Sequence, residues 1–393
     1  MAETAADTPS GSRPPRAVTS DEAYDHTTEK KLTKDERDVA ELAGPLAGWL
    51  TETLDADAPV RITDVRAPSG SGLSSVTVLL DCEWERDGES HRDQLAVRIP
   101  PAEAAYPVFR SYDLRMQYDV MAAVGAHTDV PVPPLVGIEE SGNLIGSPFL
   151  VMKAVEGRAP VDNPPYVFGG WLYDADPAER EALDRASVEV LAGVHALPDP
   201  MAKLPSLAAA AGDDALRAHF DDLRDYYEWT HREDGLRTPI LERTFDHLEA
   251  RWPRHSEPVL SWGDSRPGNI LFDGLTPAAV IDWEMAAIAP REVDIGWYVF
   301  IHRFFQDIAE VFEMPGLPDF ARPDKVAAVY EKASGYAPQD LDWFVTYAAL
   351  RHGVVMARIK RRMIHFGEEA APDDPDDYVM HRAALERLIG DSK

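Results

Sequence analysis

Three polar residues have a spacing that could support chemistry. Asp264, Asn269 and Asp282 lie in the stretch LSWGDSRPGNILFDGLTPAAVIDWE, five and then thirteen positions apart. In phosphoryl transfer, a carboxylate orients the attacking hydroxyl, while an amide oxygen and a second carboxylate hold Mg²⁺ on the nucleotide phosphates. The spacing therefore predicts Asp264 as the catalytic residue and Asn269 and Asp282 as metal ligands.

Each of these residues, taken singly, also suits a turn or a strand end. The joint pattern favours a site because apolar, strand-like residues follow Asn269 and precede Asp282. The surrounding region has helical periodicity, and only 268–283 is expected to interrupt it, with two short strands. The expected helices span 177–196, 212–232, 238–252, 294–312, 323–334, 339–366 and 376–389.

The N-terminal third has a different pattern, with a helical stripe from Asp35 to Leu50 and then alternating residues. The alternation at 75–84 and 95–99 flanks a turn at 86–88, which predicts an antiparallel hairpin. A helix at 108–124 and strands at 135–138 and 149–154 are expected next. Together these segments predict a small sheet with one inserted helix.

A run of small residues, Ser69 to Ser75, precedes the first strand of the hairpin. Such residues let backbone N–H groups approach phosphates, although similar runs are commonly ordinary turns. The run is not a Walker loop, because no Gly-Lys-Ser/Thr follows it. It is not a convincing dinucleotide-binding fingerprint either, because a strand rather than a helix comes after it. The residues expected to bind nucleotide phosphates are Ser71, Gly72, Ser74 and Ser75.

Composition narrows the classes of protein. The chain has 393 residues with a formal net charge of −30, which argues against a nucleic-acid binder. The sequence contains no apolar run long enough to cross a bilayer and no secretory signal, and its single cysteine, Cys82, excludes an internal disulfide framework. A cytoplasmic protein with no membrane partner is expected. The charge is consistent with a cationic substrate or simply with an acidic surface.

The motif residues resemble those of a known family. Residues 262–269, 281–284 and 290–294 are similar to the aminoglycoside phosphotransferase/choline kinase-like superfamily, and more narrowly to actinobacterial phosphotransferases with a WGD motif. The resemblance covers about residues 35–390. It implies an α+β, two-lobed, protein-kinase-like fold with a small antiparallel-sheet N-lobe at 57–154 and a mainly helical C-lobe at 155–393. An arm at 1–33 and a helix within 34–56 would precede the lobes.

The same resemblance assigns nucleotide contacts. Arg98, in LeuAlaValArgIle, would hold the α- and β-phosphates, although an exposed strand arginine is the alternative. Met152 would flank the adenine, and the backbone of Lys153 and Val155 would bind its edge. The co-substrate would be ATP, or GTP, with Mg²⁺.

The sequence also departs from the family in two places. Gln117 stands where a glutamate usually pairs with the cation on the strand, and Asp113 could substitute for it. Trp262 replaces a histidine and is expected to fill the same space by packing. His195 is expected to be structural, and Asp294 to accept backbone hydrogen bonds from the catalytic loop. Glu284 could face either the metal or the substrate.

The predicted activity is transfer of the γ-phosphoryl of ATP to a hydroxyl of a small molecule, such as an aminoglycoside-like compound. One alternative is a kinase of another metabolite, such as an amino alcohol or a sugar. The other is a catalytically weak nucleotide-binding regulator, suggested by Gln117 and Trp262. The acidic stretch 368–377 could attract an amine-rich acceptor or form a solvated loop paired with Arg358, Lys360, Arg361 and Arg362. The sequence does not predict the oligomeric state.

Overall fold

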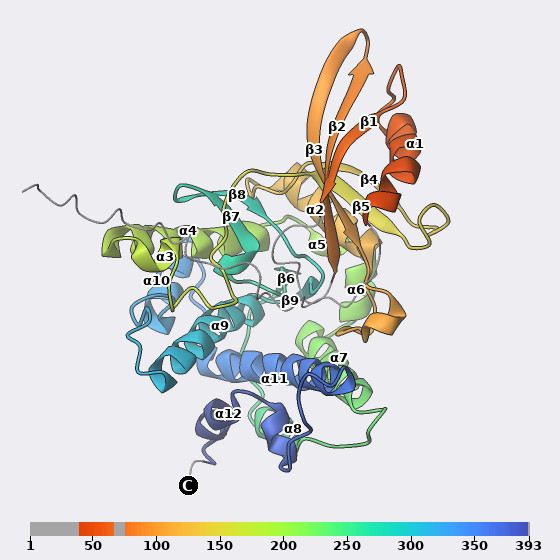
Figure 1. Cartoon of the computed structure of the whole chain (residues 1–393). Coiled ribbons are helices and arrows are strands. Elements are labelled where there is room, and N and C mark those ends of the chain that lie inside the picture. Colours follow the sequence, from red (N-terminus) through yellow and green to blue (C-terminus); the bar gives the residue numbers. More distant parts are fainter. Residues whose placement is uncertain (1–38, 67–74, 392–393) are drawn as a thin grey trace, which may run out of the picture.

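The computed structural model describes residues 39–66 and 75–391. Within them, a twisted sheet and two flanking helices stand above a larger group of helices (Figure 1). This arrangement is the two-lobed α+β fold that the sequence predicts. The arm at 1–33 and three of the expected phosphate-binding residues, Ser71, Gly72 and Ser74, lie outside the described residues.

The upper lobe is built on one antiparallel sheet with the strand order β1-β2-β3-β5-β4. The long hairpin pairs β2 with β3 around the tight turn at Asp87 and Gly88, both of which have positive φ. The antiparallel hairpin expected around a turn at 86–88 is therefore confirmed. The strands are β1 (Arg61–Arg66), β2 (Val76–Arg86), β3 (Glu89–Ile99), β4 (Leu135–Glu139) and β5 (Phe149–Lys153).

Alternation along the strands gives this sheet two apolar faces. On β5, Phe149 and Val151 pack towards α1 (Ala43–Thr53), which follows the short 3₁₀ helix Val39–Leu42. Leu150 and Met152 face the other way and join the core shared with α2 (Leu114–His127) and the helical lobe. Since successive strand residues point to opposite faces, one central strand serves both cores.

The helix after β3 begins six residues later than the pattern predicts. The Asp113 side chain accepts a hydrogen bond from the Met116 N–H at 2.8 Å, and this N-cap fixes the start of α2 at Leu114. Val108 and Phe109, which fall within the expected helix, lie instead in a bend, where the Val108 carbonyl accepts the Tyr226 hydroxyl of the other lobe.

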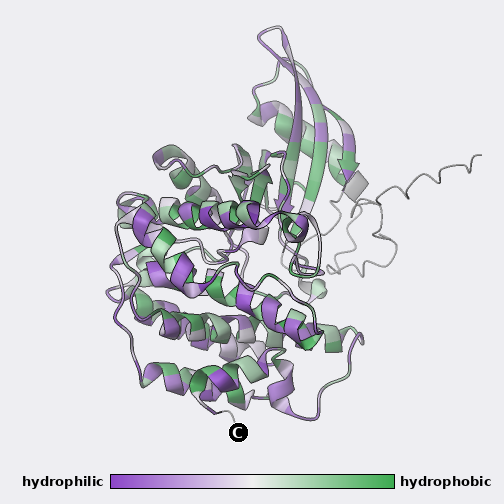
Figure 2. Ribbon diagram, turned by 90° about the vertical axis from the view of Figure 1, so that its left-hand side faces the viewer, coloured by the Kyte–Doolittle hydropathy of each residue, from purple (hydrophilic) through white to green (hydrophobic). Residues whose placement is uncertain are grey.

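The lower lobe is a set of amphipathic helices. Figure 2 shows hydrophobic and hydrophilic stripes along them, the pattern expected when one face of each helix packs inward. Helices α9 and α11 lie along each other at its centre, where a Cβ on Gly296 would come within 2.6 Å of the Phe344 backbone. The helices are α3 (Trp171–Asp174), α4 (Pro177–His195), α5 (Pro200–Lys203), α6 (Pro205–Ala211), α7 (Ala215–Thr230), α8 (Pro239–Glu249), α9 (Arg291–Val311), α10 (Pro323–Ser334), α11 (Leu341–His365) and α12 (Arg382–Ile389).

Two predictions for this lobe were wrong in detail. The interruption at 268–283 does form a hairpin, β7 (Ile270–Asp273) with β8 (Thr276–Val280), but a second pair exists, β6 (Pro258–Ser261) with β9 (Ala287–Pro290). Four-residue strands carry too little periodicity to be recognised. The expected helix 376–389 divides, because Asp374 caps the Asp376 N–H at 3.0 Å and forms a 3₁₀ turn, Pro375–Tyr378, before α12.

None of the helices within the described residues combines the length and apolar character that a membrane span requires.

Candidate active site

The loop after β6 is held from below by one buried carboxylate. Asp294, in the first turn of α9, accepts the backbone N–H groups of Trp262 at 2.7 Å and Gly263 at 2.9 Å. The Ser261 hydroxyl donates to it at 2.8 Å, and His195 lies at 2.9 Å. Burial alone would raise the pKa of Asp294, but the His195 hydrogen bond and the backbone N–H groups lower it below its ordinary value. The predicted bracing by Asp294 and the structural role of His195 are confirmed.

Trp262 connects this loop to the next one. Its ring is fully buried, and its Nε1–H lies 3.0 Å from the Ile281 carbonyl and 3.2 Å from the Asp282 carbonyl. Asp282 has a φ of 63°, a left-handed conformation that is costly for a residue other than glycine. The tryptophan therefore packs as expected and also holds the backbone of the strained aspartate.

Asp264 points into the space between these loops with both carboxylate oxygens engaged. Asn269 Nδ2–H donates to Oδ2 at 2.7 Å, and Trp297 Nε1–H donates to Oδ1 at 2.8 Å. The side chain is only 14% exposed. Burial, followed by the negative charge of Asp282, raises the pKa of Asp264 to about 7. A carboxyl with such a pKa is suited to accepting a proton near neutrality.

Two arginines flank Asp264. Arg266 Nε–H lies 3.1 and 3.0 Å from the two oxygens of Asp264, and its other end forms an ion pair with Asp162. Arg351, from α11, donates to the Gly263 carbonyl at 3.3 Å and stacks over the Trp297 ring at 4.6 Å. The positive charge of Arg351 opposes the rise in the pKa of Asp264. Arg266 therefore contacts the carboxylate directly, whereas Arg351 holds the Gly263 backbone and the Trp297 ring beside it.

Arg98 reaches the same space from β3. The side chain is 10% exposed, and its Nη2 lies 3.0 Å from Asp282 Oδ1 and 3.5 Å from Glu284 Oε2. Burial alone would lower the pKa of Arg98, but the two carboxylates raise it. Ser75 Oγ, at the start of β2, lies 3.5 Å from Glu284. The alternative of an exposed strand arginine is therefore wrong, and Glu284, for which metal and substrate were both considered, faces Arg98 and Ser75.

Neither of the residues considered as partners of Arg98 bonds to it. Asp113 caps α2, as described above. Gln117 is 1% exposed, and neither atom of its amide has a hydrogen-bond partner among the described residues; Arg98 Nε is likewise unpartnered. Buried polar atoms without partners are rare because each costs free energy. Gln117 and Arg98 thus both retain unused hydrogen-bonding capacity among the described residues.

The remaining expected nucleotide residues lie at the end of β5. Met152 is buried in the shared core, and the Lys153 side chain turns away to pair with Asp93 at 2.8 Å. The Lys153 N–H donates to the Pro134 carbonyl, and the Ala154 N–H donates to the Gln94 carbonyl. The Val155 N–H, one residue further, donates to no group within the described residues. These positions are in the connection between the lobes, where a base edge would need backbone groups.

The oxygen donors fit Mg²⁺. Asn269 uses its Nδ2–H on the Asp264 side chain and carbonyl, which leaves Oδ1 as a neutral acceptor. Asp282 uses one oxygen on Arg98. Within 39–66 and 75–391, no three His, Cys, Asp or Glu side chains cluster as a self-contained metal site. A two-ligand set is nonetheless usual for Mg²⁺, which takes its other oxygens from phosphates and water.

The structure thus brings Asp264, Asn269, Asp282, Arg98 and Ser75 together from both lobes. Sequence reasoning missed Trp297, Arg266 and Arg351 as contacts of the catalytic loop. Trp297 carries a usable signal, since it is three residues after Asp294 on one helix and so shares its face. Arg351 carries none, because it comes from a helix 87 positions after Asp264.

The acidic stretch 368–377 is engaged by nearby partners. Lys360 pairs with Glu369, and Arg382 pairs with Asp374 at 2.7 Å and with Asp377 at 3.0 Å. Of the expected cationic partners, Lys360 forms an ion pair with the stretch, and the Glu368 charge acts on Arg362, whereas Arg358 and Arg361 pair with residues of the loop after α7. Part of the negative charge of the stretch is therefore paired within the chain.

A family model described as "Phosphotransferase enzyme family" matches residues 74–329. The chain belongs to that family. A crystal structure described as a "putative aminoglycoside phosphotransferase" from Ralstonia eutropha has a TM-score of 0.63 and 19% identity, covering 89% of this chain and 98% of its own. A thermostable mutant of aminoglycoside phosphotransferase APH(4)-Ia, in a ternary complex with AMP-PNP and hygromycin B, has a TM-score of 0.51 and 16% identity, covering 88% of this chain and 98% of its own.

Curated relatives carry other names. "Probable acyl-CoA dehydrogenase IBR3" of Arabidopsis thaliana is 24% identical over 82% of this chain, and "Acyl-CoA dehydrogenase family member 10" of Mus musculus is 27% identical over 52%. The chain spans only 39% and 18% of their lengths. The solved structures share the fold, and none of these similarities defines the acceptor.

Proposed function

We propose that this protein is a Mg²⁺-dependent kinase that transfers the γ-phosphoryl group of ATP, or GTP, to a hydroxyl of a small molecule. The observation that carries the proposal is the position of Asp264. Its carboxylate is fixed by Asn269 and Trp297 beside Asp282 and Arg98, which come from a different loop and a different lobe. A base, a pair of metal ligands and a phosphate-binding cation thus meet at one point.

The nucleotide half of the proposed site consists of Arg98, Ser75 and the end of β5. The Arg98 guanidinium would exchange its contact with Asp282 for phosphate oxygens, which it can bind in a bidentate manner. Asn269 and Asp282 would hold Mg²⁺, which when bound neutralises charge on the phosphates. Backbone groups near Lys153 and Val155 would bind the base.

The acceptor half depends on Asp264. With a pKa near neutrality, its carboxylate can orient the attacking hydroxyl and accept the proton as the new P–O bond forms. Trp297 and Asn269 hold both oxygens in place, so alignment supplies much of the rate enhancement and no covalent enzyme intermediate is needed.

The acceptor class is proposed only broadly. Solved relatives are aminoglycoside phosphotransferases, one of them with hygromycin B bound, whereas the curated relatives are named as acyl-CoA dehydrogenases. Several carboxylates of the acidic stretch 368–377 form ion pairs within the chain, which weakens one argument for a cationic acceptor. Hydroxylated acyl thioesters therefore belong in a screen together with aminoglycosides, amino alcohols and sugars.

The test is transfer of label from [γ-³²P]ATP, or from the GTP equivalent, to each member of that panel in the presence of Mg²⁺. We expect one class to be labelled, and we expect Asp264→Ala to abolish labelling while nucleotide binding persists. Tight nucleotide binding with no transfer and no slow hydrolysis would instead favour the catalytically weak regulator. Wild-type turnover in Asp264→Ala would remove the role assigned to that residue.

A further inference from the structure

Both carboxylate oxygens of Asp264 already accept two contacts each. Oδ1 accepts Trp297 Nε1–H at 2.8 Å and Arg266 Nε–H at 3.1 Å. Oδ2 accepts Asn269 Nδ2–H at 2.7 Å and the same Arg266 Nε–H at 3.0 Å. A carboxylate offers about four lone-pair sites, two on each oxygen. An acceptor hydroxyl that donates its hydrogen to Asp264 must therefore displace one of these three donors.

Two of the three donors are held by further contacts. Asn269 Nδ2–H also bonds the Asp264 carbonyl at 3.0 Å. The Trp297 ring is buried on α9, with the Arg351 guanidinium over it at 4.6 Å. Arg266 makes the longest of the contacts with the carboxylate, because one Nε–H is shared between the two oxygens. Arg266 is therefore the donor that can be displaced at the lowest cost.

A second carboxylate, Asp162, lies at the other end of the Arg266 guanidinium. It belongs to the irregular segment between β5 and α3, and its Oδ2 forms an ion pair with Arg266 Nη1. The other oxygen of Asp162, Oδ1, is buried and has no hydrogen-bond partner among the described residues. A buried carboxylate oxygen without a donor costs free energy. Asp162 can therefore accept a second N–H from the same guanidinium.

Gly268 leaves the room in which this second contact can form. A Cβ on Gly268 would lie 2.7 Å from Asp162 Oδ2, 2.8 Å from Arg266 Nη1 and 2.9 Å from Asp162 Oδ1. All three atoms thus surround one point, and the unpartnered oxygen lies close to the guanidinium. Arginine favours bidentate pairing with carboxylates, in which two N–H groups meet two oxygens. Asp162 therefore offers Arg266 a complete alternative to its contact with Asp264.

We propose that Arg266 is a two-position latch on the catalytic base. In the position seen in the structure, its Nε–H covers the Asp264 carboxylate. In the other position, the guanidinium pairs with both oxygens of Asp162, and the acceptor hydroxyl takes the freed lone pair of Asp264. Arg266 and Asp162 are thus positioning residues for the transfer step. The effect of the latch on turnover rests on the proposed kinase function, whereas the contacts that form the latch do not.

The latch would suppress hydrolysis of ATP when no acceptor is bound. In that side reaction, the water oxygen bonds to the γ-phosphorus, the bond from phosphorus to the β,γ-bridging oxygen breaks, ADP leaves and the water proton passes to Asp264. An acceptor hydroxyl reacts in the same way, but the rest of the acceptor supplies binding free energy that can displace the arginine. A water molecule has no such additional contacts. The latch therefore discriminates between the acceptor and water.

Hydrolysis of [γ-³²P]ATP with Mg²⁺ tests the latch without knowledge of the acceptor. Arg266→Met should raise the hydrolysis rate about tenfold or more, because the general base is then permanently uncovered. Asp162→Ala should lower the rate about threefold or more, because Arg266 loses the charged partner that draws it off Asp264. In the Arg266→Met background, Asp162→Ala should have no effect. A purely structural role of Arg266 would lower the rate instead of raising it.

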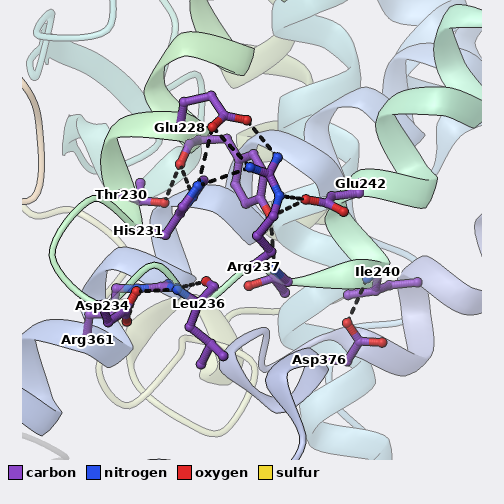
Figure 3. Close-up of polar contacts among 12 residues, drawn as sticks. Glu228, Thr230, His231, Asp234, Leu236, Arg237, Ile240, Glu242, Arg361 and Asp376 are labelled. Carbon is purple, nitrogen blue, oxygen red and sulfur yellow. Dashed lines mark hydrogen bonds and ion pairs between the residues drawn. The ribbon is translucent and has the colours of Figure 1, made fainter.

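Arg237→Met is the matched control for Arg266→Met. Arg237 also places its Nε–H on one carboxylate, that of Glu242, and an Nη2–H on another, that of Glu228, at 2.7 Å (Figure 3). It lies in the loop after α7, so this variant should hydrolyse ATP at the wild-type rate. Hydrolysis by Arg266→Met at or below the wild-type rate, or an equal rise in Arg237→Met, would overturn the latch.

A double-mutant cycle measured by urea denaturation tests the contact itself and needs no turnover. The effects of Arg266→Met and Asp264→Asn on the unfolding equilibrium constant should depart from additivity by about tenfold, as expected for directly bonded partners. Additive effects would overturn the latch. If neither the wild type nor Arg266→Met hydrolyses ATP or labels any acceptor while the coupling is present, the proposed function fails and the contact between Arg266 and Asp264 stands.

Discussion

The sharpest structural prediction concerns Gly263, the residue before the proposed catalytic aspartate. Its φ is +90°, and a Cβ there would lie 2.0 Å from the Met285 carbonyl oxygen and 2.4 Å from the carbon. Since real Cβ contacts are at least about 3 Å, Gly263→Ala must displace one of two backbone loops by about 1 Å. The left-handed conformation adds roughly 1–2 kcal/mol and the overpacking another 1–3 kcal/mol.

The displacement would also move Asp264. A misplacement of about 1 Å can reduce turnover about 100-fold, so activity should fall more than stability alone explains. Gly274→Ala is the matched control: its φ is +61°, but a Cβ there meets nothing within 4 Å. Urea denaturation and kcat are measured for both variants. If Gly263→Ala matches Gly274→Ala in stability and retains wild-type kcat, the argument from loop packing is refuted.

Three further variants test other contacts. Asp294→Asn should lower the free energy of unfolding in urea by about 2–4 kcal/mol, because the amide NH₂ would face backbone N–H donors. Since the fold lowers the pKa of Asp294, the stability advantage of the wild type over this variant should shrink below about pH 4. A stability loss under about 1 kcal/mol would contradict the bracing role. Arg98→Met should weaken ADP binding about 10- to 100-fold by calorimetry, with unchanged affinity as the contrary result. Trp262→His should lower stability by about 2 kcal/mol yet keep kcat within about tenfold, and inactivity in a folded variant would show that the indole does more than pack.

Features of this chain that depend on neighbouring residues could be predicted from the sequence. The hairpin, the central helices and the Asp264–Asn269–Asp282 spacing depend on local periodicity or on one continuous motif, and the structure reproduces them. Boundaries failed where a single side chain decides them: Asp113 starts α2, and Asp374 separates a 3₁₀ turn from α12. Caps of this kind compete with apolar patterning that continues past them.

Contacts between segments that are far apart in the chain could not be predicted from the sequence. Asp294 could be expected to brace the loop after β6 because it follows the motif closely, but Arg351 reaches that loop from α11, 87 positions after Asp264. Gln117 shows the opposite case. It was one of two residues considered as partners of Arg98, yet no hydrogen bond joins them, because the guanidinium turns to Asp282 and Glu284, where two negative charges outweigh one neutral amide.

The central claim is that Arg98 of the upper lobe and the metal ligands Asn269 and Asp282 of the lower lobe bind the same nucleotide. Asp264 acts on the acceptor hydroxyl instead. Calorimetric ADP binding with and without Mg²⁺ tests it without any acceptor. We predict that Mg²⁺ tightens ADP binding in the wild type, that this gain disappears in Asp282→Asn, and that it persists in Asp264→Asn. ADP binding that is independent of Mg²⁺ in the wild type, or a gain retained in Asp282→Asn and lost in Asp264→Asn, would contradict the assignment.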